Sequence, residues 1–226
     1  MIPSPLPKNY IFDLDGTLVD SAPDLAHALN HVLKRLGKLP VPLEDVRHLT
    51  GHGARPLIER GLSLNGMPSD DADIDRELGH FLDYYAANIA VDTRPYPGAV
   101  ELLDLLREQG AKVGLCTNKS ERLTRLLLDA LELTDYFDAI LGGDTLPVRK
   151  PDPGHVLGTI EALGGQPQET LYFGDTITDF EACKGAQVPI ILVRFGYSRL
   201  PVEDFKVNGL ISSYEEVIHR LRGGQA

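Results

Sequence analysis

The chain has 226 residues, which is enough for one large domain or for a domain that carries a smaller insertion. Its formal net charge of -11, without any dense cluster of lysine and arginine, argues against nucleic acid as a partner. The composition is that of a soluble globular protein, and no apolar run has signal-peptide or membrane-spanning character, so we expect no membrane partner. The only two cysteines lie far apart, which favours a reducing compartment and a cytoplasmic protein.

A short apolar run near the N-terminus ends in two carboxylates and a glycine. Residues 8–18 read Lys-Asn-Tyr-Ile-Phe-Asp-Leu-Asp-Gly-Thr-Leu, which predicts a buried strand of a parallel sheet. Residues two apart leave a strand on the same side, so Asp13 and Asp15 would crowd together at its carboxyl end. Two crowded acids need a positive partner, and hard oxygen ligands favour Mg²⁺. Taken alone, Asp15-Gly16 is as consistent with a simple turn.

A long helical segment follows this strand. Ser21 and Asp24 have the spacing of a capping box, and apolar residues recur at helical spacing from Leu25 to Leu36. From Pro40 to Asn88 the pattern stays helical and polar, with no convincing strand. The segment therefore reads as an all-helical insertion directly after the first strand.

Beyond the linker at residues 94–98, helices and strands alternate. The pattern predicts helices at 100–107 and 121–131 and strands at 112–116, 139–141, 171–173 and 190–193. Such alternation implies an α/β fold, a Rossmann-like parallel sheet with helices on both faces. We expect residues 1–19 and 94–226 to form this core domain and residues 20–93 to form an inserted α-helical cap domain over the strand ends.

Polar residues follow several of the predicted strands, at the edge where parallel sheets bind ligands. Thr117 and Asn118 offer a hydroxyl and an amide suited to phosphate oxygens, and Lys150 offers a positive charge. Asp175 and Asp179 lie about one helical turn apart after a later strand. Each residue alone has a plainer explanation, as a helix cap, a loop or a surface lysine. Their coincidence at strand ends favours one shared site.

The order of these motifs resembles that of a known family. Asp13-Leu14-Asp15-Gly16-Thr17, then Thr117-Asn118, Lys150-Pro151 and Gly174-Asp175-x-x-x-Asp179 resemble the haloacid dehalogenase superfamily. The helical insertion resembles the small α-helical cap of that superfamily. Val19-Asp20-Ser21 and Thr50-Gly51-His52-Gly53 are most similar to its phosphoglycolate phosphatase branch.

The resemblance implies a Mg²⁺-dependent phosphatase acting on a small phosphorylated metabolite, with phosphoglycolate as the first candidate. Asp13 would be the nucleophile that forms an aspartyl-phosphate, and Asp15 would act as general acid and then as general base. Asp13, Asp175 and the backbone carbonyl of Asp15 would bind Mg²⁺.

The remaining motif residues would bind substrate or support the nucleophile. Thr117 and Asn118 would hold the phosphoryl oxygens, and Lys150 would neutralise charge beside Asp13. Asp179 would orient Lys150 or a metal-bound water from outside the ligand set.

The cap is expected to choose the substrate. His52 and Gly53 lie in a flexible loop that could lower a helix N-terminus over the leaving group. Arg55 is a candidate for binding a substrate carboxylate, and pairing with Glu59 is an equal alternative.

Other functions remain open at this point. A phosphomutase similar to β-phosphoglucomutase, a pyrophosphatase or a nucleotidase would share the same core motifs. A receiver-like phosphorylated switch is disfavoured because its acid sits on a later strand. A degenerate binding protein is disfavoured because Asp13 and Lys150 are both present. The chain would be a monomer or a homodimer.

Overall fold

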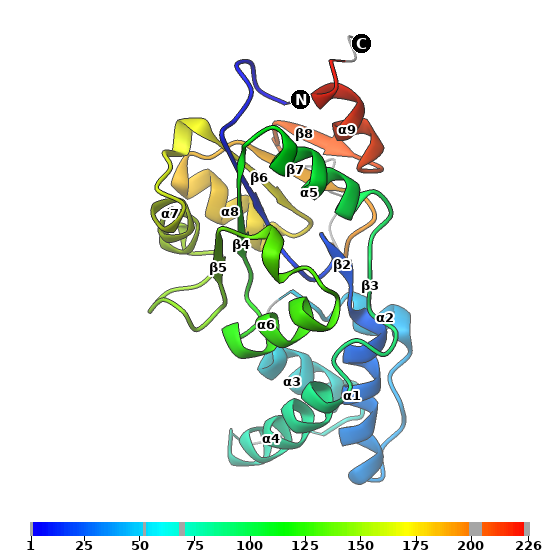
Figure 1. The fold of residues 1–226 in the computed structure, drawn as a ribbon. Helices are drawn as coiled ribbons and strands as arrows, with labels where there is room; N and C mark the ends of the chain where they lie inside the picture. Colours follow the sequence, from blue (N-terminus) through cyan, green and yellow to red (C-terminus); the bar gives the residue numbers. More distant parts are fainter. Residues whose placement is uncertain (1, 52, 68–70, 199–204, 224–226) are drawn as a thin grey trace.

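The computed structural model describes residues 2–51, 53–67, 71–198 and 205–223 and contains a six-stranded parallel sheet (Figure 1). The strand order is β5-β4-β1-β6-β7-β8, and each hydrogen-bonded neighbour in it is parallel. The strands are β1 (Asn9–Phe12), β4 (Lys112–Cys116), β5 (Ala139–Leu141), β6 (Thr170–Gly174), β7 (Ile190–Val193) and β8 (Gly209–Ile211). The predicted α/β fold class is therefore confirmed.

Helices cover both faces of this sheet (Figure 1). One face carries α5 (Ala99–Glu108), α6 (Glu121–Ala130) and α9 (Glu215–Leu221), and the other carries α7 (Pro153–Ala162) and α8 (Ile177–Ala186). Short 3-10 turns occupy η1 (Thr134–Tyr136) and η2 (Pro167–Glu169). In β1, Tyr10 and Phe12 join the first apolar cluster and Ile11 joins the second, which explains the continuous apolar run of this strand.

The helical segment lies below the sheet in Figure 1. It contains α1 (Ala22–Arg35), α2 (Leu43–Arg47), α3 (Ala54–Leu64) and α4 (Asp71–Ala87), which share an apolar cluster that Leu123 of α6 also joins. Its two ends pass through an antiparallel ribbon of β2 (Val19–Asp20) and β3 (Arg94–Pro95). The ribbon lies next to the boundaries expected for the two domains, and the division itself stays a prediction.

The start of α1 differs from the expected capping box. Ser21 makes no cap hydrogen bond and instead donates to the carboxylate of Asp15. Asp24 accepts hydrogen bonds from the backbone N–H groups of Asp92 and Thr93 and from the Thr93 hydroxyl. The prediction was wrong because both side chains find partners outside the helix, and Asp24 thereby ties α1 to the end of the helical segment.

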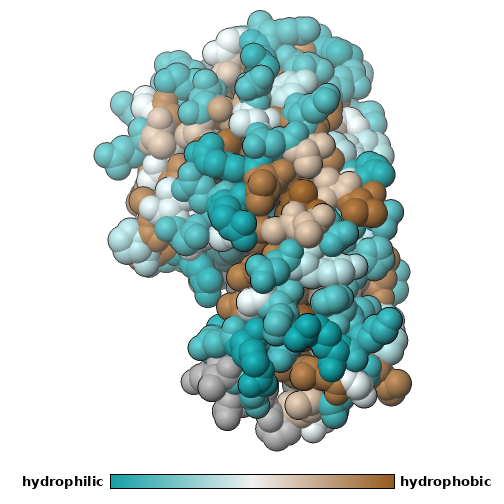
Figure 2. All heavy atoms as spheres, turned by 60° about the horizontal axis from the view of Figure 1, so that its bottom comes forward, coloured by the Kyte–Doolittle hydropathy of each residue, from teal (hydrophilic) through white to brown (hydrophobic). Residues whose placement is uncertain are grey.

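The described helices do not have the features that a membrane-spanning helix requires. Among them, none combines the length and apolar character needed to cross a bilayer. In Figure 2 the forward face is largely hydrophilic, and its outline narrows between the sheet part above and the helical part below.

His155, in the first turn of α7, is a fully buried titratable group outside the predicted site. Its Nε2 lies 3.1 Å from the carbonyl oxygen of Gly142, which requires this nitrogen to carry the proton. Burial lowers the pKa of His155 to about 4, and the nearby charge of Lys150 acts in the same direction. The ring is therefore neutral in the folded protein at neutral pH.

We expect His155 to make the fold sensitive to acid. The pKa in the unfolded chain is near 6.5, so between that value and about 4 the unfolded state binds more protons. The free energy of unfolding should fall over this window by up to about 3 kcal/mol as the pH drops. Urea unfolding across this pH range should show a steeper loss in the wild type than in His155→Gln. The exposed His219→Gln is the control, and parallel curves for wild type and His155→Gln would contradict a buried neutral histidine.

Candidate active site

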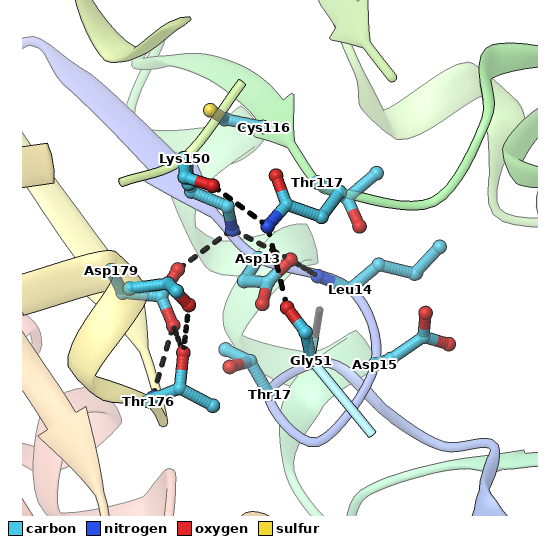
Figure 3. A network of polar contacts seen from close by, with 12 residues as sticks. Asp13, Leu14, Asp15, Thr17, Gly51, Cys116, Thr117, Lys150, Thr176 and Asp179 are labelled. Atoms are coloured by element: carbon cyan, nitrogen blue, oxygen red, sulfur yellow. Dashed lines mark hydrogen bonds and ion pairs between the residues drawn. The ribbon is translucent and has the colours of Figure 1, made fainter. Parts of the chain in front are cut away.

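Asp13 stands at the carboxyl end of the central strand β1. Its backbone N–H donates to the carbonyl of Phe173, which continues the ladder one residue past the strand. Its Oδ1 accepts from the backbone N–H of Leu14 at 2.7 Å and lies 2.9 Å from Nζ of Lys150 (Figure 3). These contacts fix the carboxylate while its residue remains 6% exposed, so a small ligand can still reach it.

Lys150 is buried between two carboxylates and a phenol. Its Nζ lies 2.7 Å from Oδ1 of Asp179 and 2.9 Å from the hydroxyl of Tyr172. Asp179 is itself fixed by a capping box at the start of α8, where its Oδ2 accepts from the backbone N–H and hydroxyl of Thr176. Asp179 therefore lies where the sequence predicts it, beside Lys150 (Figure 3).

Asp175 follows β6 and shares the same edge of the sheet. Its Oδ2 accepts from the backbone N–H of Tyr197 at 2.7 Å, and its Oδ1 accepts from the Thr17 hydroxyl at 3.1 Å. One oxygen from each of Asp13, Asp175 and Asp179 lies within 4.8 Å of the others. Carboxylate oxygens at this spacing are the donor set that Mg²⁺ prefers.

The charges of this cluster do not balance without a further cation. Burial raises the pKa of Asp13 to about 7, although Lys150 opposes the shift. Burial raises the pKa of Asp175 well above its ordinary value, and the negative charges of Asp179 and Asp13 add to the effect. Among the described residues, three buried carboxylates face one lysine, so a divalent cation would restore charge balance. The residues present therefore fit a metal ion.

Thr117 and Asn118 follow β4, as predicted, and border the same edge. Thr117 is buried, and its hydroxyl accepts a hydrogen bond from the backbone N–H of Lys119. The side-chain amide of Asn118 donates to the carbonyl of Lys150 at 3.0 Å and to that of Gly51 at 3.3 Å. Asn118 thus links the sheet edge to the helical segment.

Asp15 is turned away from Asp13 (Figure 3). Both of its carboxylate oxygens lie 2.9 Å from Nζ of Lys119, and Oδ1 also accepts from Ser21. Burial lowers the pKa of Lys119, but the charge of Asp15 and the contact with Tyr85 outweigh it and hold the pKa above its ordinary value. The candidate general acid is therefore held in an ion pair with a buried lysine.

A pocket of about 250 Å³ lies between the strand ends and the helical segment. The polar residues on its sheet side include Asp13, Asp15, Thr117, Asn118 and Lys119. Its opposite wall is mostly apolar and comes from α1, α3 and α4, with Leu25, Leu57, Phe81 and Tyr85 among its residues. The small volume suits a small ligand.

The predicted cap residues are placed differently from one another. Gly53 and Arg55 line the pocket, whereas His52 lies outside the described residues. Arg55 pairs with Glu59, with Nε 3.2 Å from Oε1, and also with Asp75. The alternative that pairs Arg55 with Glu59 is thus present in the structure, and a role in substrate binding stays a prediction.

Several residues of this site received no role from the sequence, and Thr17, Lys119, Tyr172 and Tyr197 are among them. Thr17 and Lys119 stand inside the motif segments, so their proximity to the motif acids was the available signal. Tyr172 lies in a strand that reads as pure core, and Tyr197 follows the last predicted strand. Nothing in the local pattern marks either tyrosine as a partner of the acids.

The chain matches known proteins over most of its length. A family model described as haloacid dehalogenase-like hydrolase matches residues 10–193. The phosphoglycolate phosphatase of Agrobacterium fabrum is 44% identical over 214 residues, which cover 95% of this chain and 92% of the relative. The phosphoglycolate phosphatase of Caulobacter vibrioides is 43% identical over 206 residues, with 91% and 87% coverage. These matches confirm the resemblance of the motifs.

Solved structures show the same architecture. A crystal structure of a predicted phosphoglycolate phosphatase from Haemophilus somnus superposes with a TM-score of 0.89 at 28% identity, covering 94% of this chain and 97% of that one. CbbY from Rhodobacter sphaeroides in complex with phosphate gives a TM-score of 0.81 at 23% identity, with 94% and 96% coverage. The second likeness concerns the fold alone.

The site requires a glycine at position 16, because there is no room there for a side chain. The φ of Gly16 is +84°, and a Cβ there would collide with the carboxylate of Asp175 and the ring of Tyr197. Gly110 has a similar φ of +71° with open space around it, so Gly110→Ala reports the backbone strain alone, about 1–2 kcal/mol. We expect Gly16→Ala to lower the free energy of unfolding in urea by about 1–3 kcal/mol more. Equal losses in the two variants would contradict this close approach.

Proposed function

The chain belongs to the haloacid dehalogenase-like hydrolase family and is a phosphatase, and on this basis we propose that it hydrolyses a small phosphorylated metabolite, phosphoglycolate first. The observation that carries the proposal is Asp13, fixed by Lys150 at the strand edge beside Asp175. The relatives named phosphoglycolate phosphatase support the choice of substrate. Cys116 and Cys183 are free and buried, which is consistent with the reducing cytoplasm expected from the sequence.

In the proposed reaction Asp13 is the nucleophile. Its Oδ1 is occupied by Lys150 and the Leu14 N–H, and within the described residues no hydrogen bond reaches Oδ2. Oδ2 attacks phosphorus and the bond from phosphorus to the ester oxygen breaks. Asp15, which takes up a proton from water once it has left Lys119, gives that proton to the leaving oxygen. Asp15 then takes a proton from water as that water attacks phosphorus and releases phosphate from Asp13.

Mg²⁺ would be held by Asp13, Asp175 and, as the family resemblance implies, the backbone carbonyl of Asp15. When bound, it offsets the repulsion between the carboxylates and the phosphate. Asp175 is already oriented for this role by the Tyr197 N–H and the Thr17 hydroxyl, which fix both of its oxygens.

The other motif residues orient the reacting groups. Lys150 holds Asp13 in place and adds positive charge where the phosphoryl group would sit. Thr117 and Asn118 border that position and would hold phosphoryl oxygens. Asp179 would orient Lys150 through the contact between their side chains. The capping box at the start of α8 fixes Asp179 itself.

The test is phosphate release, with Mg²⁺ present, from a panel of phosphoglycolate, sugar phosphates, nucleotides and pyrophosphate. We expect phosphoglycolate to give the highest kcat/KM, and Asp13→Asn to lower it by at least about 1,000-fold because the nucleophile is lost. Asp135→Asn, at an exposed position, is the matched control. Substantial turnover by Asp13→Asn would rule out the covalent mechanism, and a different preferred substrate would rule out the phosphoglycolate assignment.

Metal binding has a readout independent of turnover. Mg²⁺ at about 100 times its Kd should raise Tm by on the order of 5–10 °C, because it binds only the folded cluster of acids. Asp175→Asn should lose most of this rise and Asp135→Asn should keep it. An undiminished rise in Asp175→Asn would show that the metal binds elsewhere.

A further inference from the structure

The ion pair of Lys119 with Asp15 joins the proposed general acid to the pocket. The side chain of Lys119 is 6% exposed and that of Asp15 is 13% exposed, so the pair is almost withdrawn from water. Lys119 bridges both carboxylate oxygens, and Ser21 donates to one of them. All of these donors hold Asp15 away from the position it needs beside Asp13.

This pair must open in the proposed reaction. Asp15 has to turn toward the ester oxygen, and its oxygens are occupied by Lys119 until it does. Within the part of the chain that the structure describes, Asp15 is the carboxylate paired with Lys119, and a buried ammonium that loses such a partner is strongly disfavoured unless another anion replaces it. The reaction therefore needs a second anion near Lys119 at the moment Asp15 leaves.

Tyr85 is a second polar group that lines the pocket beside Lys119. Tyr85, on α4, is 1% exposed, and among the described residues its hydroxyl makes no hydrogen bond of good geometry, although it lies close enough to Lys119 to help to hold the pKa of that lysine up. Nζ of Lys119 lies 4.8 Å from the centre of its ring, and both side chains line the pocket together with Asp15. A buried hydroxyl without a partner is uncommon in folded proteins, because such groups are normally hydrogen-bonded.

We propose that Lys119 and Tyr85 form the binding site for the carboxylate of the leaving group. The carboxylate takes the place of Asp15 on Lys119, accepts a hydrogen bond from the Tyr85 hydroxyl, and so frees Asp15 to face the ester oxygen. This inference rests on the proposed phosphatase function and adds the residues that choose its substrate. A neutral leaving group would leave Lys119 paired with Asp15 and the acid withdrawn.

Arg55 is the competing cation in this pocket, and its surroundings differ. Its partners Glu59 and Asp75 both lie on the helical segment, and neither has a place in the reaction. Nothing in the proposed chemistry requires these pairs to separate. The partner of Lys119, by contrast, is the residue that the reaction must move.

The test compares phosphoglycolate with ethyl phosphate, which has the same chain length and no carboxylate. Lys119→Met keeps the length of the side chain and removes the charge, and should lower the ratio of kcat/KM for the two substrates by about 10- to 100-fold, mainly through KM for phosphoglycolate. Tyr85→Phe removes only the hydroxyl and should lower the ratio by about 3- to 10-fold. Lys119→Arg should keep most of the preference, and the exposed Lys184→Met should keep all of it.

Three outcomes would overturn the proposal. An unchanged ratio in both Lys119→Met and Tyr85→Phe would show that neither residue meets the carboxylate. Equal losses on both substrates would limit Lys119 to positioning Asp15. Loss of the preference in Arg55→Met with its retention in Lys119→Met would move the carboxylate site to the helical segment.

Binding to an inactive protein separates this inference from the proposed function. The background is Asp13→Asn with Mg²⁺ present. Calorimetry should show that adding Lys119→Met raises the Kd for phosphoglycolate by about tenfold or more. Adding Asp15→Asn instead should tighten binding by about tenfold, because the competing carboxylate is gone. Such binding without turnover in the wild type would overturn the proposed function and support the carboxylate site. Turnover by the wild type, together with binding that neither Lys119→Met nor Asp15→Asn changes, would support the proposed function and overturn the carboxylate site.

Discussion

The buried ammonium of Lys150 is the constraint on which the polar edge of this sheet depends. It contacts Asp13 after β1, Tyr172 on β6 and Asp179 on α8, so one charge joins the N-terminal strand to a strand and a helix that lie far along the chain. A lysine this deeply buried would be costly alone, and the two acids would repel each other without it. Burial lowers the pKa of Lys150, but Asp13 and Asp179 outweigh this effect and hold the pKa above its usual range. Each charge is therefore tolerated because of the others.

The sequence predicted those parts of the molecule that follow from short-range pattern. The parallel sheet could be predicted because β1, β4 and β6 are short apolar runs separated by helical periodicity. The site could be predicted because Asp13, Thr117 and Asp175 fall after such runs, and parallel strands place their carboxyl ends at one edge. What these residues contribute chemically remains a proposal from the family resemblance and the geometry.

The parts that could not be predicted depend on contacts between distant residues. Ser21 and Asp24 match a capping box in the sequence. In the structure, however, Ser21 donates to Asp15 and Asp24 accepts from Thr93. The two-residue strands β2 and β3 are too short for any periodicity to reveal. The mutual pairing of Lys119 and Asp15 spans 104 positions, and only the folded chain brings the two side chains together.

The short ribbon of β2 and β3 also has a consequence for how this architecture can diversify. Asp20 and Arg94 face each other across the ribbon, so the chain leaves the sheet and returns to it at one place. An entire helical unit can thus be lengthened, shortened or exchanged at this ribbon while the strands of the sheet, and the acids that follow them, keep their positions. Of the two residues of the proposed carboxylate site, Tyr85 lies on this helical unit and Lys119 lies beside the strand ends. Mutation in the helical unit can therefore change one side of the pocket without rebuilding the edge of the sheet.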